Sequence, residues 1–302
     1  MLLILLTLVL FLTILFLPPV GFFSGMLTPA PTAVALIRWG LPNALLVPGC
    51  SVLIGSLVLY LLNISDFIPY LLALMGVGAL IGYGLRSRWS IEKVVGLSSL
   101  VLIGAAALVL VFVLAEAKGD LFGRIEQEMH AAISTALKQF WGESPESQEL
   151  ESKLAEVVPM MVQTMPGMFV SCALGISWLN LLISRRYCRM ASIELCTPEK
   201  LALWKTPEFI VWFAIAGGLM ALVPVGDLRV AGINLLIVMG SIYFLQGLAI
   251  MAFFFERWRL PFFVKGILYA LLFVQQFASM ATAVLGLFDI WFDFRKLTRK
   301  QA

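Results

Sequence analysis

Long apolar runs, each about 20 residues and separated by charged joints, constrain this chain more than any other feature. About 20 mostly apolar residues are needed for a helix to cross the hydrocarbon core of a bilayer. Only 13% of the 302 residues are charged and 61% are apolar, whereas a soluble domain has about a quarter of its residues charged. Most of the surface must therefore face lipid, and we predict an integral membrane protein.

Eight segments meet the length requirement. Inside lipid every backbone N–H and C=O group must be bonded within its own segment, which favours helices. A β-barrel would require short alternating segments, and the sequence has none. We therefore predict an all-α polytopic bundle of about eight transmembrane helices, with a range of 7–9. The expected helices span 2–26, 41–62, 67–85, 94–115, 160–184, 208–225, 231–254 and 264–287.

The first 40 residues leave two arrangements open, because proline removes a helix hydrogen bond and clashes with the preceding turn. One is a kinked helix followed by a re-entrant stretch from Thr28 to Trp39, and the other is a pair of short helices. The interrupting residues are Pro18, Pro19, Pro29 and Pro31. Further along, Gly78 and Gly82 have a spacing that lets helix backbones approach closely. Gly104 with Ala107, and Ala214 with Gly218, show similar small-residue spacing.

One long polar insertion separates two membrane parts of a single membrane domain. The N-terminal part is 1–115, the insertion is 116–158 and the C-terminal part is 159–302. Apolar residues recur through the insertion at helical spacing, which predicts either a helical hairpin or one amphipathic helix on the membrane surface or over the bundle. The insertion carries nine acidic and four basic residues, so we expect it to pack on the protein rather than on anionic lipid.

The positions of Lys and Arg predict the orientation of the chain. Twelve of them lie in the loops after the first, third, fifth and seventh expected helices, and the opposite short loops hold only Arg229. We therefore expect these twelve on the cytoplasmic side and the acidic insertion outside. The basic tail, with Arg295 and Lys296, disagrees with eight full crossings. A re-entrant final segment or a different helix count would remove the disagreement.

Catalytic and metal-binding motifs are missing from the sequence. It has one histidine, His130, and four cysteines without a CxxC pair, which indicates neither a zinc site nor a disulfide framework. It also lacks HExxH, GxSxG and a P-loop. We therefore expect no enzyme activity, metal or cofactor. The net charge of +3 and the placement of the basic residues give no indication of nucleic-acid binding.

Uncharged polar residues inside the spans are the best ligand-binding candidates. A side-chain amide in hydrocarbon is costly unless it has a partner, so Asn180, Asn234 and Gln246 should turn inward. They would form either interhelical hydrogen bonds or the lining of a polar pocket. Arg38 follows the proline-broken segment and is either an interfacial anchor or a contact for an anionic ligand group.

Ordered motifs along nearly the whole chain carry a family resemblance. They run from the prolines before Arg38-Trp39-Gly40, through Trp204-Lys205-Thr206-Pro207-Glu208, to a motif in the seventh helix and a final motif. The last two are Tyr243-Phe244-Leu245-Gln246-Gly247-Leu248 and Gly286-Leu287-Phe288-Asp289-Ile290-Trp291-Phe292-Asp293-Phe294-Arg295. In these motifs the chain resembles the YybS-like family of bacterial multi-pass membrane proteins. That family is loosely similar to the substrate-binding subunits of energy-coupling-factor transporters and to the rod-shape protein MreD.

The final motif also supplies a charged cluster. Asp289 and Asp293 share a helix face, and Arg295 is close enough in sequence to pair with either. The cluster is either a structural ion network at a helix end or a docking site for a partner protein.

The resemblance implies a bacterial cytoplasmic (inner) membrane protein without an established activity. Our leading hypothesis is small-solute binding or transport, with a separate energising partner as an option. The alternative is a scaffold or assembly protein of the cell envelope that recruits partners.

Overall fold

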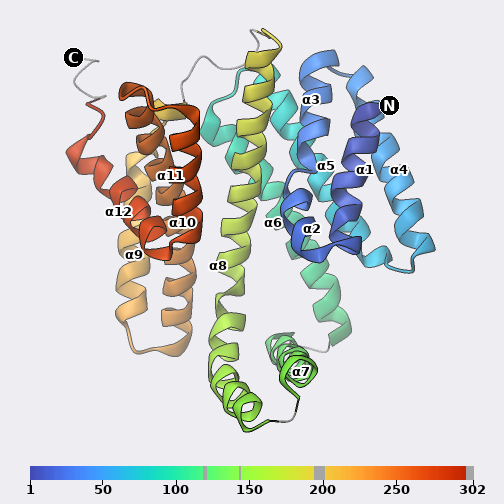
Figure 1. The fold of residues 1–302 in the computed structure, drawn as a ribbon, viewed down its shortest axis with the longest axis vertical. Helices are drawn as coiled ribbons and strands as arrows, with labels where there is room; N and C mark the ends of the chain where they lie inside the picture. Colours follow the sequence, from blue (N-terminus) through green and yellow to red (C-terminus); the bar gives the residue numbers. More distant parts are fainter. Residues whose placement is uncertain (118–120, 143, 194–200, 297–302) are drawn as a thin grey trace. The chain divides into compact units, whose positions relative to one another are not determined.

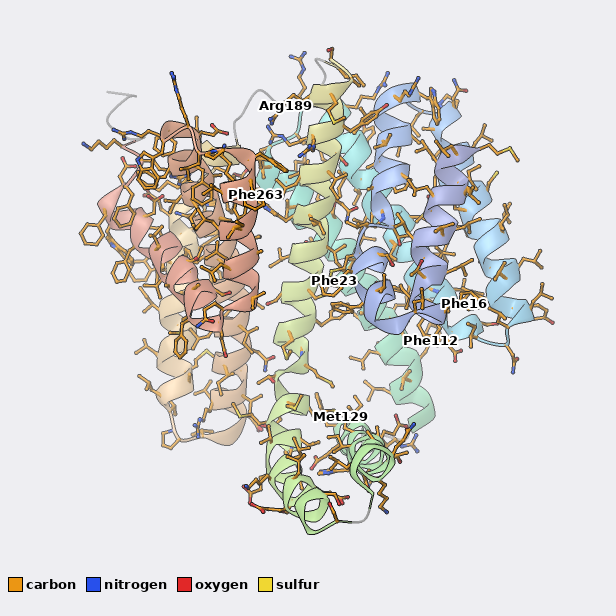
Figure 2. All side chains as sticks on the ribbon, in the orientation of Figure 1. Phe16, Phe23, Phe112, Met129, Arg189 and Phe263 are labelled. Carbon is orange, nitrogen blue, oxygen red and sulfur yellow. The ribbon has the colours of Figure 1, made fainter. Side chains whose placement is uncertain are left out.

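The computed structural model describes residues 1–117, 121–142, 144–193 and 201–296, and these fold as helices joined by turns (Figure 1). The predicted all-α, membrane-type architecture is confirmed. Large apolar side chains cover its surface, and Figure 2 shows Phe16 and Phe263, which are 67% and 75% exposed. Such a surface suits lipid rather than water. The protein is therefore a multi-pass membrane protein.

The number of full-length spans is lower than the expected eight. Within the described residues, six helical stretches are long and apolar enough to cross a membrane, or up to seven if one bent pair counts as a span. They are Val20–Trp39, Asn43–Leu61, Ser65–Arg86, Ile91–Leu114, Glu149–Met190 and Gly226–Arg257. Two further apolar helices, Leu2–Phe16 and Glu208–Leu222, are shorter. The seven-span count lies at the lower end of our range.

The expected segment 2–26 is a hairpin of two short helices, which agrees with the second of the two arrangements left open for the first 40 residues. The first helix ends at Phe16, and the next begins at Pro18, where a proline fits because the first turn needs no N–H partner. Gly21 lies directly on the first helix, since an added Cβ would come within 2.3 Å of the Ile14 Cα. The helices of this region are α1 (Leu2–Phe16), α2 (Pro18–Met26), α3 (Pro29–Trp39), α4 (Leu46–Leu61) and α5 (Ile68–Arg86).

α3 is the most buried helix of this region and packs against α5. An added Cβ on Gly78 would lie 2.4 Å from the Pro29 carbonyl oxygen, and one on Gly82 would lie 2.7 Å from the Ala33 carbonyl oxygen. The predicted close packing at Gly78 and Gly82 is therefore confirmed. An added Cβ on Gly104 or Gly218 would meet nothing within 4 Å, so those two positions are not close contacts.

The polar insertion is a helical hairpin whose second arm continues into the membrane helix that follows. α7 (Leu121–Trp141) is amphipathic, with Ile125, Met129 and Ile133 half-buried and Leu137 buried. α8 (Pro145–Met190) runs without a break through the expected boundary at 158/159, although it contains Pro159 and Pro166. The remaining helices are α6 (Ile91–Ala117), α9 (Val211–Leu222), α10 (Gly226–Arg257), α11 (Phe262–Val274) and α12 (Gln276–Phe292).

The chain divides into two compact units that do not follow its order in sequence. Unit 1 comprises Met1–Ala106, Val170–Glu208 and Gly240–Ala302, and unit 2 comprises Ala107–Phe169 and Phe209–Met239. Unit 1 holds most of the buried apolar residues, including Leu71, Leu74, Ile81 and Leu181. Unit 2 contains the α9–α10 turn, where Gly232 lets α10 approach the backbone of Met220 and Ala221.

The last expected span, 264–287, is a pair of helices bent by 99°. The bend lies at Gln275, whose backbone is extended between α11 and α12. α12 then packs tightly on α10, because an added Cβ on Gly247 would lie 2.1 Å from the Thr282 carbonyl oxygen and one on Gly286 would lie 2.0 Å from the Tyr243 carbonyl oxygen. Glycine at both positions allows this approach.

Candidate functional site

A seam of polar side chains runs through the apolar interior of unit 1. Its members come from the α2–α3 turn, from α6 and from the last turns of α8, and each is at least 98% buried. We call this set the polar seam: Thr28, Ser98, Ser99, Ser177, Asn180 and Ser184. Ser177, Asn180 and Ser184 share one face of α8 because they follow each other at intervals of three and four residues.

One part of the polar seam is internally bonded. The Ser99 hydroxyl contacts the Ser177 hydroxyl at 3.1 Å and the Val95 carbonyl oxygen at 2.8 Å. It also lies 3.3 Å from the Ala173 carbonyl oxygen. These contacts join α6 to α8, since a buried hydroxyl bonded across helices stabilises their packing.

Asn180 joins α8 to the break between α2 and α3. Its Nδ2 donates to the Met26 carbonyl oxygen at 2.7 Å and to the Ile176 carbonyl oxygen at 2.8 Å. Met26 is the last residue of α2, where carbonyl groups have no donor from the next helical turn. One N–H of the amide therefore holds the broken helix against α8, and the other is bonded within α8 itself.

Four buried polar atoms of the polar seam have no hydrogen-bond partner. They are Thr28 Oγ1, Ser98 Oγ, Asn180 Oδ1 and Ser184 Oγ. The amide oxygen is the most informative, because it can only accept a hydrogen bond and has two lone pairs to satisfy. Leaving such a group unsatisfied costs about 1–3 kcal/mol. An unsatisfied buried group in a native structure calls for an explanation, and contact with a water, an ion or a ligand is one.

Asn234, in unit 2, makes the same kind of hydrogen bonds, but both polar atoms of its amide are bonded. Its Nδ2 donates to the carbonyl oxygens of Val230 and Gln163, each at 2.9 Å, and its Oδ1 accepts from the Gly167 N–H at 2.6 Å. Gln163 and Gly167 are the groups that would pair with each other in an unbroken helix. The side chain thus bridges a turn of α8 beside Pro166.

Gly167 has no side chain, and this lets Asn234 approach the backbone of α8. An added Cβ would lie 2.8 Å from the Asn234 carbonyl oxygen and 2.8 Å from its Oδ1. These contacts are those of an interhelical bridge, which was the structural alternative for this residue.

Gln246 joins the charged cluster of the final motif. Its Nε2 donates to Asp289 Oδ2 at 3.3 Å, and its Oε1 accepts from the Thr206 N–H at 3.2 Å. Arg295 forms an ion pair with Asp289, with Nη2 2.7 Å from Oδ2 and both side chains fully buried. The Phe294 N–H donates to the other carboxylate oxygen at 3.0 Å. We call Thr206, Gln246, Asp289 and Arg295 the C-terminal latch.

The C-terminal latch also fixes the tail to the loop before α9. Arg295 Nη1 donates to the carbonyl oxygens of Ala202 and Trp204, at 2.9 and 2.8 Å. Trp204 in turn packs on Trp178 and donates to the Glu92 carboxylate at 2.7 Å. Thr206 Oγ1 and Arg295 Nε of the latch lack a hydrogen-bond partner, as does Tyr243 OH on α10. Both oxygens of the carboxylate and both polar atoms of the amide are bonded.

These contacts favour one of the two hypotheses for the final motif, a structural ion network or a docking site. Arg295 pairs with Asp289, whereas Asp293 ends α12 in the left-handed conformation with φ of 41°. Burial of Asp289 and Arg295 makes them a structural network rather than a docking surface. Arg295 also bonds the loop that carries Lys205, one of the twelve basic residues that we expect on the cytoplasmic side. The other basic tail residues, Arg299 and Lys300, lie outside the described residues.

Arg38 is exposed in the last turn of α3, where a cation is favoured by the helix dipole. Arg86 has the contact that sequence reasoning missed, since its Nη1 donates to the Ile37 carbonyl oxygen at 3.3 Å near Gly40. The serines and Thr28 of the polar seam were also missed. Their signal in the sequence is a Ser–Asn–Ser spacing of three and four residues in an otherwise apolar helix.

His130 lies half-buried on α7. Among the described residues, no group of three or more His, Cys, Asp and Glu side chains is arranged to hold a metal ion. Cys50 and Cys172 are free thiols, whereas Cys188 is disulfide-bonded. The last observation corrects the expectation of unpaired cysteines.

The comparisons with known proteins give a family and no function. A family described as "Predicted membrane protein (DUF2232)" matches residues 5–290, and the chain therefore belongs to this family. No curated protein and no solved structure matches the chain. The match agrees with the resemblance to YybS-like membrane proteins.

Proposed function

We propose that this member of the DUF2232 family binds a small, uncharged polar solute in the polar seam and carries it across the bacterial cytoplasmic membrane. The observation that supports the proposal is the set of four fully buried polar atoms without partners on α6, on α8 and at the α2–α3 break of unit 1. Bonded to a solute, these atoms would recover the free energy that their burial costs.

The composition of the polar seam defines the solute class. Hydroxyl groups donate and accept, and an amide oxygen accepts. None of the six seam residues carries a formal charge. A polyol, an amide or a neutral heterocycle with N–H and O–H donors fits such a surface, whereas an ion with a full negative charge does not. The apolar residues around the seam, such as Leu181 and Leu102, would contact the carbon skeleton.

Transport rather than simple binding is favoured by the break between α2 and α3. Helices interrupted in the middle of a bundle recur in transporters, because the freed backbone groups line the substrate site. Here the interrupted stretch Val20–Trp39 is 61% buried. The proposal assigns no catalysis, because none of the six seam residues is a general base that could activate a serine hydroxyl as a nucleophile.

A ligand-stabilisation screen tests the proposal. The detergent-purified protein would be unfolded by heat in the presence of polyols, amides, nucleobases and vitamins, because a bound solute raises apparent stability by mass action. We expect one class to raise the unfolding midpoint of the wild type. Ser184→Ala should reduce that shift, whereas Asn234→Leu, which alters an amide in unit 2, should retain it.

Uptake by proteoliposomes then separates transport from binding. The stabilising solute, radiolabelled, should accumulate in vesicles with the wild-type protein and more slowly with Ser184→Ala. If no solute class shifts the unfolding midpoint, or if Ser184→Ala responds like the wild type, the polar seam is not a solute site. The alternative of an envelope scaffold would then be preferred, and co-purification of a stoichiometric partner would support it.

A further inference from the structure

We infer that the break between α2 and α3 holds a sodium ion, bound by Asn180 Oδ1, Thr28 Oγ1 and the Met26 carbonyl oxygen. The inference deepens the proposed function, because a bound ion would couple solute movement to a sodium gradient. The ion-binding step itself needs no solute. With the ion in place, Thr28 Oγ1 and Asn180 Oδ1 contact the solute only through the ion, and Ser98 Oγ and Ser184 Oγ remain for direct contact with the solute.

Two of the three oxygens belong to Met26 and Thr28 at the α2–α3 break, and the third belongs to Asn180, whose amide contacts that break. Asn180 Nδ2 is 2.7 Å from the Met26 carbonyl oxygen, and Oδ1 belongs to the same amide group. Thr28 follows Met26 by two residues and begins α3 without a side-chain cap bond. Thr28 Oγ1 and Asn180 Oδ1 are both buried and unpartnered. The Met26 carbonyl oxygen has a second lone pair beyond the one that Asn180 uses.

The helix ends at the break favour a cation. α2 ends at Met26, and the C-terminal end of a helix carries partial negative charge on its carbonyl groups. The opposing N-terminal end of α3 would normally present N–H groups that repel a cation. Here Pro29 and Pro31 have no N–H, and the Ala30 N–H donates to the Leu27 carbonyl oxygen at 3.0 Å. The break therefore presents acceptors rather than donors.

The neutral ligands indicate a monovalent ion. Calcium sites use carboxylates, and magnesium is held through one or two of them. The three proposed ligands are an amide, a hydroxyl and a backbone carbonyl. Asp289, the buried carboxylate of unit 1, is paired with Arg295. Unwound backbone carbonyls and half-helix C-terminal ends are the groups that coordinate sodium in transporters.

Thermal unfolding in different chlorides tests the inference without any solute. The purified protein would be compared in NaCl, KCl and choline chloride at equal ionic strength, so that screening is constant. We expect NaCl to raise the wild-type midpoint by about 2–4 °C over the other two salts. Binding of ²²Na⁺ should saturate at one ion per chain and resist competition by K⁺.

Thr28→Val is the decisive variant because it removes one oxygen from a side chain of nearly unchanged shape. It should abolish the NaCl-specific shift and the ²²Na⁺ binding. Ser51→Ala is the matched control, since Ser51 Oγ is another fully buried, unpartnered hydroxyl of unit 1, on α4. Its sodium response should equal that of the wild type.

Three results would overturn the inference. They are equal stabilisation by all three salts, preference for K⁺, and a full sodium response in Thr28→Val. The first would assign the unpartnered oxygens to ordered water. Sodium binding without any stabilising solute would leave the ion site in place and remove the proposed transport function. Solute binding without a sodium effect would do the reverse.

Discussion

Two asparagines, the buried Asn180 of unit 1 and the half-buried Asn234 of unit 2, both bridge helices but differ in whether the amide oxygen is bonded. Each donates one N–H to the carbonyl oxygen four residues earlier in its own helix. Each donates the other to a backbone carbonyl of a second helix, at Met26 and at Gln163. Asn234 Oδ1 also accepts from Gly167, whereas Asn180 Oδ1 accepts from nothing in the structure.

The difference separates a structural bridge from a binding position. A completely bonded amide lowers the energy of one helix arrangement and offers nothing to a ligand. An amide with a free oxygen holds the backbone equally well but remains under-satisfied until something binds. The C-terminal latch resembles Asn234, because the Gln246 amide and the Asp289 carboxylate are both bonded. In the latch, the bonded groups include an ion pair between charged side chains.

The largest effect is expected from Arg295→Met in the C-terminal latch. The substitution leaves the Asp289 carboxylate buried without its cation, which costs about 3–5 kcal/mol of unfolding free energy. It also leaves the carbonyl oxygens of Ala202 and Trp204 without the guanidinium donors. Denaturant unfolding of the detergent-solubilised protein, followed by tryptophan fluorescence, would measure the loss.

Arg38→Met is the matched control because it also removes an arginine, at an exposed position. It should change the unfolding free energy by less than about 0.5 kcal/mol. The interpretation of the latch as a bonded structural cluster would be wrong if both variants had the same small effect. A selective loss of the sodium or solute response in Arg295→Met, at unchanged stability, would contradict it as well.

Asn234→Leu should destabilise the protein by about 1–3 kcal/mol. It removes the partner of the Gly167 N–H and one donor to Gln163, and a buried unsatisfied backbone group costs that much. Stabilisation by sodium and by solute should be unchanged, measured as midpoint shifts against the variant's own baseline. A lost ligand response would show that the bonded asparagine is not purely structural.

Asn180→Leu should cost less, about 1 kcal/mol. The Met26 carbonyl loses its donor, but the unpartnered Oδ1 is removed at the same time, and the two contributions oppose each other. The same variant should lose the sodium-dependent shift entirely. The contrast with Asn234→Leu is the sharpest test of the comparison. If Asn180→Leu and Asn234→Leu destabilised the protein equally and both retained the sodium-dependent shift, both asparagines would be structural bridges and the comparison would fail.

Hydropathy predicts the helical class because lipid permits few other arrangements, and glycine spacing predicts the contact of Gly78 and Gly82 with α3. The inward position of Asn180 also follows from burial cost. The partner of each amide cannot be predicted in this way, since Met26 lies 154 residues from Asn180 in sequence. The sequence offered a re-entrant final segment only as an option against a full span at 264–287, because hydropathy averages over Gln275 and Gln276, two polar residues in an apolar run.

The smallest effects test the same rule among the hydroxyl groups of the polar seam. Ser177→Ala removes a hydroxyl that contacts Ser99 and should cost about 0.5–1 kcal/mol. Ser184→Ala removes a buried hydroxyl without a partner, so the unfolding free energy should stay the same or rise by up to about 1 kcal/mol. Both serines lie on one face of α8 and are fully buried, which makes each the control for the other. If Ser184→Ala were the more destabilising of the two, its hydroxyl would have a structural partner, and the distinction between bonded and unbonded seam residues would fail.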